Sequence, residues 1–329
     1  MTVSADIADA AHVRPQLTQP TDPALSLTFA VALVLLVHGY LVGLWTDVHG
    51  ERFWLVDLIR TWVARPLGLG EDLGPLGVML LLAATGYSLA AGARVLAILV
   101  PAAAAAGLTF ALAGHGALSS GPTILAWVVL LALAGRAATA ITDLIPERRQ
   151  WTWYLAQLVL VVDLVALAEI TPALQPAAAV AAFYPLVVIG QLIHAVRGGG
   201  LPAWAGGSLG FASYAVVVIA DRTVPALDGW WYPLAASYAA LLFATAVTFA
   251  GRTAAQVAAH PVARWAAHRT WWYLLFIGPV AHPALTALHT VLPTWVAVAL
   301  AVIGTAVVVE AGCRLARFFA AIVTRRVTS

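Results

Sequence analysis

Two ionisable side chains, His38 and Asp163, stand inside long apolar stretches of this sequence. Because an imidazole titrates near neutral pH, His38 could act as a general base towards a hydroxyl group or carry an acyl group briefly. A carboxylate can orient such a ring and stabilise its protonated form, and Asp163 is the candidate for this role. We therefore predict that His38 and Asp163 are catalytic. The alternative for His38 is a structural hydrogen bond to a neighbouring helix.

The spacing gives both residues a similar depth if their stretches are membrane helices. His38 lies about 13 residues into one stretch and Asp163 about 12 into another, which is roughly 18–20 Å at 1.5 Å per residue. A carboxylate at the centre of a bilayer costs about 2.5–3.5 kcal/mol on insertion scales and needs a partner or water. We expect Asp163 to lie within hydrogen-bonding or one-water reach of His38, or else of Arg136 or His282.

Three further residues, Arg94, Arg136 and His282, are candidates for substrate binding. His282 stands between two prolines and could supply a second imidazole, or stabilise a helix kink through a hydrogen bond. Arg136 could contact a donor substrate or pair with Asp163. Arg94 belongs to a set of arginines that could hold the phosphates of acyl-coenzyme A, although arginines also accumulate in cytoplasmic loops for insertion reasons alone.

The composition requires a membrane environment for these side chains. Of 329 residues, 62% are hydrophobic and 10% are charged, and the mean hydropathy is +0.91. A soluble domain has about 25% charged residues. A bilayer crossing takes about 20 apolar residues, so the chain has room for about ten transmembrane helices in an all-α fold. The apolar runs are 25–46, 74–92, 95–113, 122–142, 151–170, 172–196, 201–220, 230–251, 270–291 and 293–319.

The distribution of arginines predicts the orientation of these helices in the membrane. With ten crossings and a cytoplasmic N-terminus, twelve arginines fall at cytoplasmic ends and four on the opposite side. We predict a multi-pass protein of the bacterial inner (plasma) membrane with both termini in the cytoplasm. Residues 1–24 and 320–329 would be cytoplasmic tails, and 25–319 the membrane domain. The arginines are dispersed, so no nucleic-acid partner is expected, and no metal-ligand spacing is found.

Two connections are long enough to contain helices of their own. The stretch Arg52–Pro66 within the connection Trp45–Pro75 has charged and apolar faces, and we expect a helix that lies in the outer membrane interface. The connection Gly251–Thr270 carries arginines and histidines among alanines and predicts a short amphipathic helix at the cytoplasmic surface.

Several short motifs follow one another along the chain. They are the apolar run ending in His38-Gly39, the helix Leu76–Leu89, the segment Arg94–Pro101, Trp151-Thr152-Trp153-Tyr154, Pro185–His194, Tyr273-Leu274-Leu275 followed by Pro279, and Val309-Glu310 followed by Arg314. In this order they resemble the membrane acyltransferase-3 family and span most of residues 25–319. In that resemblance His38 occupies the position of the family's functional histidine.

The resemblance implies a ten-helix core that moves acyl groups across the membrane onto glycans and lipids. We expect a divergent transmembrane O-acyltransferase that uses a cytoplasmic thioester donor, with acyl-coenzyme A as the candidate donor and no tightly bound cofactor. The acceptor would be a hydroxyl group of a cell-envelope glycan or glycolipid.

Two alternatives remain open. The family's arginine, acidic residue and late histidine fall near Leu27, Ala156 and Phe276 in this chain. Their absence would fit an inactive member that scaffolds or regulates another envelope-synthesis protein. A transporter of lipid-linked glycan is the second alternative.

Overall fold

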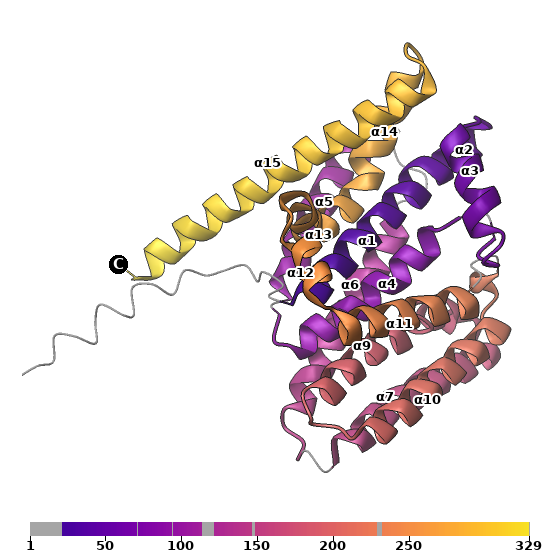
Figure 1. The fold of residues 1–329 in the computed structure, drawn as a ribbon, viewed down its shortest axis with the longest axis vertical. Helices are drawn as coiled ribbons and strands as arrows, with labels where there is room; N and C mark the ends of the chain where they lie inside the picture. The colour runs from indigo at the N-terminus through magenta and orange to yellow at the C-terminus, as the bar shows by residue number, and fades with distance from the viewer. Residues whose placement is uncertain are drawn as a thin grey trace, which may run out of the picture.

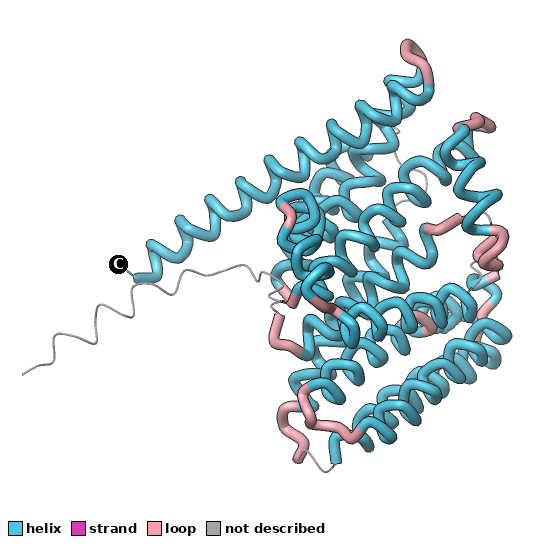
Figure 2. The backbone as a smooth tube through the Cα atoms, in the orientation of Figure 1, coloured by secondary structure: helices cyan, strands magenta, loops and turns pink. Residues whose placement is uncertain are grey.

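The computed structural model describes residues 22–70, 72–93, 95–113, 122–146, 149–228 and 232–328. Within these ranges the chain forms helices and connecting turns and contains no strand (Figures 1 and 2). The predicted all-α class is therefore confirmed.

The longer helices are α1 (Pro23–Leu36), α4 (Gly74–Ala90), α5 (Leu96–Ala113), α6 (Pro122–Thr142), α7 (Gln150–Ile170), α9 (Tyr184–Arg197), α10 (Ala203–Thr223), α11 (Tyr232–Phe249), α13 (Pro261–Phe276) and α15 (Thr294–Thr328). The shorter segments are η2 (Val37–Gly43), α2 (Leu44–His49), α3 (Trp54–Ile59), η3 (Arg60–Ala64), η5 (Pro172–Leu174), α8 (Gln175–Ala181), η6 (Pro225–Leu227), α12 (Arg252–Ala259), η7 (Ile277–Ala281) and α14 (His282–His289).

Each of the ten predicted apolar runs falls on a helix or on consecutive helical segments. In the described part of the chain, six of these helices or series of consecutive helical segments are long and apolar enough to cross a membrane. They are Pro23–His49, Gln150–Ile170, Pro172–Arg197, Ala203–Thr223, Tyr232–Phe249 and Thr294–Phe318. The membrane class predicted from composition agrees with this, whereas the count of ten crossings stays a prediction.

Helix α4 lies at the centre of the bundle and packs against α1, α9 and α11 (Figure 1). Its contact with α9 is close because glycines face the partner backbone. A Cβ on Gly86 would lie 2.0 Å from the carbonyl oxygen of Val187, and a Cβ on Gly190 would lie 2.0 Å from that of Ala83. Only glycine fits at these two positions, so the sequence itself allows these helix axes to approach.

The path α1–η2–α2 runs beside the path α13–η7–α14 in the same direction. The Thr270 hydroxyl donates to the Phe29 carbonyl at 3.1 Å near one end of the contact, and His282 bonds the Tyr40 carbonyl further along. The two ends of the bundle are named from these paths: the Asp22 end, where α1 and α13 begin, and the α2 end.

The outermost helices expose apolar side chains. Helices α7 and α10 form one edge, and α15 forms another and extends beyond the bundle (Figure 1). Ile170 is 81% exposed, Phe211 is 73% exposed and Val307 is 63% exposed. Apolar surface of this extent is unusual for a protein surrounded by water and is expected where lipid covers the helices.

The two long connections contain helices, as predicted. Segments α3 and η3 occupy Trp54–Ala64, and α12 with the first turns of α13 occupies the second connection. Helix α15 continues to Thr328, through the stretch predicted as a C-terminal tail.

Candidate functional site

His38 lies in the π-helical segment η2, which interrupts the helical path between α1 and α2. Segments of this kind widen the helix locally and occur frequently at functional sites. Both ring nitrogens of His38 are buried, and neither has a hydrogen-bond partner among the described residues. An enclosed polar group without a partner costs free energy, since it has lost water and gained nothing in return. The described residues therefore provide no partner for the structural hydrogen bond that is the alternative for His38.

Asp72 lies against the same segment. Its Oδ1 accepts a hydrogen bond from the Gly74 N–H at 2.8 Å, which holds the carboxylate at the start of α4. A Cβ on Gly39 would come within 2.4 Å of that oxygen, so the residue next to His38 must be glycine for Asp72 to take this place. Burial raises the pKa of Asp72, while the Gly74 amide, His38 and Arg60 oppose that effect.

Arg60 in η3 supplies a positive charge to the same region. Its Nη2 lies 2.5 Å from Oδ2 of Asp47, and its side chain is 12% exposed. Electrostatic interactions link the His38 ring with both Asp72 and Arg60. We call His38, Asp72 and Arg60 the His38 cluster.

The His38 cluster combines a proton acceptor with a stabilising charge. A neutral imidazole nitrogen can take a proton from a hydroxyl group, and a nearby carboxylate favours the imidazolium that forms. Arg60 can stabilise negative charge that develops on a reacting oxygen. Among the residues that the structure describes, no three His, Cys, Asp or Glu side chains are grouped to hold a metal ion.

The structure does not show the predicted pairing of Asp163. Asp163 is exposed and forms no hydrogen bond or ion pair with His38, Arg136 or His282. The buried face of α7 includes Tyr154. Asp163 follows Tyr154 by nine residues, which at 3.6 residues per turn is two and a half turns, so its side chain points away from that face.

The predicted binding residues do not form one site. Arg136 donates from Nη1 to the Thr139 hydroxyl of its own helix at 3.1 Å. His282 donates from Nε2 to the Tyr40 carbonyl at 2.7 Å and so joins η2 to the start of α14. His282 therefore makes a hydrogen bond to a neighbouring segment, while its role in stabilising a kink stays a prediction. Arg94 lies outside the described residues.

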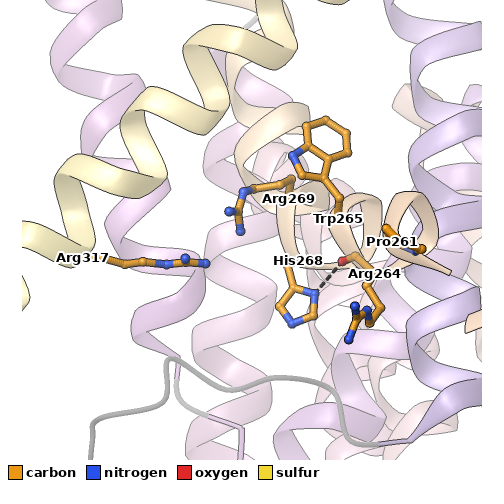
Figure 3. A pocket seen from close by; sticks show the side chains of 6 residues that line it. All are labelled: Pro261, Arg264, Trp265, His268, Arg269 and Arg317. Carbon is orange, nitrogen blue, oxygen red and sulfur yellow. Dashed lines mark hydrogen bonds between the residues drawn. The ribbon is translucent and has the colours of Figure 1, made fainter. Parts of the chain in front are cut away.

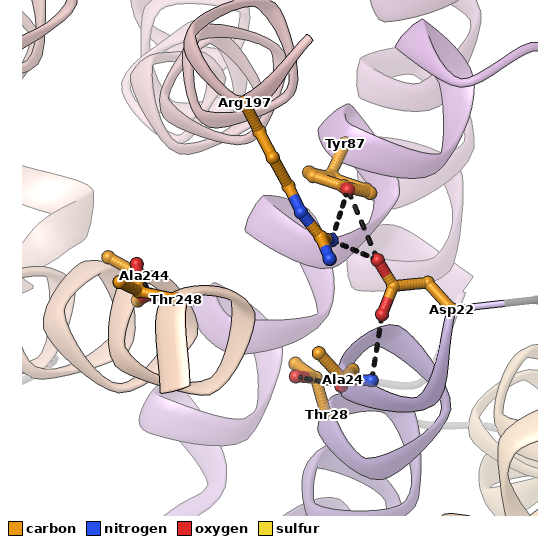
Figure 4. A network of polar contacts seen from close by, with 7 residues as sticks. All are labelled: Asp22, Ala24, Thr28, Tyr87, Arg197, Ala244 and Thr248. Carbon is orange, nitrogen blue, oxygen red and sulfur yellow. Dashed lines mark hydrogen bonds and ion pairs between the residues drawn. The ribbon is translucent and has the colours of Figure 1, made fainter. Parts of the chain in front are cut away.

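Arg197, which belongs with Arg94 to the arginines considered for phosphate binding, is already paired in the structure. Figure 4 shows Arg197 of α9 bonded to Asp22 and, at 2.8 Å, to the Tyr87 hydroxyl. Asp22 also caps α1 by accepting from the Ala24 N–H at 2.9 Å. This network fastens the start of α1 to the ends of α4 and α9, which explains Arg197 structurally.

Sequence reasoning missed Asp72 and Arg60 as neighbours of His38. Asp72 stands in the charged connection Trp45–Pro75, outside the ten apolar runs. The available signal was its position two residues before Gly74-Pro75, because an aspartate just before a helix start commonly accepts a backbone N–H.

Comparisons with known proteins add no relative. No protein-family model, curated protein or solved structure matches this chain.

Proposed function

We propose that this protein is a transmembrane O-acyltransferase in which His38 is the general base and Asp72 takes the role first assigned to Asp163. The observation that supports the proposal is the His38 ring, whose two nitrogens have no hydrogen-bond partner among the described residues and on which the charge of Asp72 acts. The ordered motifs that resemble the membrane acyltransferase-3 family supply the reaction class.

In the proposed reaction a ring nitrogen of His38 takes the proton from an acceptor hydroxyl. The resulting oxygen nucleophile attacks the carbonyl carbon of the thioester donor, the new ester bond forms, and the carbon–sulfur bond breaks. The imidazolium then returns its proton to the departing thiolate. Asp72 stabilises the imidazolium, and Arg60 stabilises negative charge on the carbonyl oxygen.

The proposal includes the orientation predicted from the arginines. The Asp22 end would face the cytoplasm and the donor, and the α2 end would face a cell-envelope glycan or glycolipid. The protein would reside in the inner membrane with ten crossings.

The test is acylation of envelope glycans, measured by mass spectrometry in a host that lacks the gene and is complemented at matched expression. His38→Ala should lower acylation by about 10²–10⁴-fold, the usual contribution of a general base. His260→Ala is the matched control, because His260 is exposed and lies at the start of α13. Full acylation with His38→Ala would overturn the catalytic role. If deletion of the gene still impaired the envelope, the scaffold alternative would be favoured.

A further inference from the structure

A basic cavity of about 260 Å³ lies between α13 and α15, at the Asp22 end and away from the His38 cluster. Its lining residues are Pro261, Arg264, Trp265, His268, Arg269 and Arg317. None of these is acidic. Figure 3 shows Arg317 extending from α15 towards the part of α13 that carries His268 and Arg269.

The positive charge of this cavity is only partly compensated. Glu310 accepts two hydrogen bonds from Arg269 at 3.0 Å and one from Arg314 at 2.9 Å. Arg264 and Arg317 are exposed, and neither has an ion pair among the described residues. The cavity therefore has two guanidinium groups available for a ligand.

His268 lies within this positive field. Its Nδ1 lies 2.5 Å from the Arg264 carbonyl oxygen, and its Nε2 is buried without a partner among the described residues. Burial lowers the pKa of His268, and the charges of Arg269, Arg317 and Arg264 lower it further, against the effect of the Arg264 carbonyl. An anion would relieve this repulsion and favour the protonated ring, whose Nε2–H could then donate to it while Nδ1–H donates to the Arg264 carbonyl.

The size and surroundings of the cavity indicate which anion fits. Pockets for drug-sized ligands measure about 300–1,000 Å³, so this cavity suits a single headgroup rather than a whole nucleotide. Guanidinium groups match phosphate oxygens in charge and geometry. Next to Arg317 on α15, Phe318 is 61% exposed, which offers apolar surface for an acyl chain near the cavity.

We propose that the cavity between α13 and α15 binds the phosphate of an anionic phospholipid, with Arg264 and Arg317 as its main contacts. Basic pockets between membrane helices are known to hold anionic headgroups. The bound lipid would fill the gap where α15 leaves the bundle and fix α15 against α13. This site is independent of the acyl-transfer proposal.

The experiment uses the full-length protein, stripped of lipid in neutral detergent. Phosphatidylglycerol, phosphatidylcholine and inorganic phosphate are added separately, and lipid adducts are counted by native mass spectrometry alongside thermal unfolding. We expect phosphatidylglycerol to bind at least about tenfold more tightly than phosphatidylcholine and to raise the unfolding midpoint. Arg264→Gln combined with Arg317→Gln should remove this preference.

Arg252→Gln is the matched control, since Arg252 is an exposed arginine on the neighbouring α12 and does not line the cavity. It should bind lipid as the wild type does. Circular dichroism should show unchanged helix content in the double variant, which loses no ion pair among the described residues. Equal binding of the two lipids, or undiminished binding by the double variant, would overturn the proposal. If inorganic phosphate bound to the protein and phosphatidylglycerol did not, the assignment of the ligand as a lipid would be overturned.

Discussion

At the scale of single residues, replacing Asp72 with asparagine tests whether the negative charge of this side chain, rather than its size and hydrogen bond, supports the reaction. Asp72→Asn keeps an oxygen that can accept from the Gly74 N–H but removes the negative charge near His38. We expect acyl transfer to fall about tenfold or more, because the imidazolium loses its stabilising partner. Asp228→Asn, on an exposed turn, should leave the activity unchanged.

The same substitution has a pH-dependent effect on stability. Burial raises the folded-state pKa of Asp72 above its unfolded-state pKa. The folded protein therefore loses stability as the pH rises from the unfolded-state pKa through the folded-state pKa, because the buried carboxyl group must then become charged. Asp72→Asn should therefore unfold at a higher temperature than wild type at pH 7.5, and the difference should shrink towards pH 4. A lower midpoint for the variant at pH 7.5 would show that the carboxylate stabilises the fold.

At the scale of helices, the contact between α4 and α9 depends on the absence of side chains. Gly86→Val would drive a branched side chain into the Val187 carbonyl. We expect a loss of about 1–3 kcal/mol or more, since backbone cannot move aside as a side chain can. Thermal unfolding of the purified protein measures this. Gly210→Val is the control, because a Cβ at Gly210 meets nothing within 4 Å, and an equal loss there would refute the packing argument.

At the scale of the whole molecule, the parallel course of α1 and α13 fixes which loops share a side. His260 precedes α13 at the Asp22 end, and Val48 lies near the end of α2. In a Cys313→Ser background, cysteines at Ser4, His260 and Ser329 should react with an impermeant thiol reagent only from the cytoplasm. A cysteine at Val48 should react only from outside. Labelling of Ser329→Cys from outside the cell would contradict the proposed topology.

The amino-acid sequence by itself determined the class of protein and the positions of most helices. Hydropathy and helix formation depend mainly on residues that are close together in the sequence. The ten apolar runs could therefore be located without knowing how the helices pack against one another. His38 stood out for the same local reason, since an imidazole within an apolar run is costly wherever that run is placed.

Only the tertiary structure decided which residue lies beside His38. The Asp72 carboxylate lies against Gly39, the residue next to His38, because Gly39 and Gly74 let α4 begin close to η2, and this contact joins segments more than thirty residues apart. Asp163, for which counting residues predicts a similar depth, points away from the buried face of α7. Depth follows from counting residues along one helix, whereas orientation depends on which neighbours the helix packs against, and the sequence of a single chain does not reveal that choice.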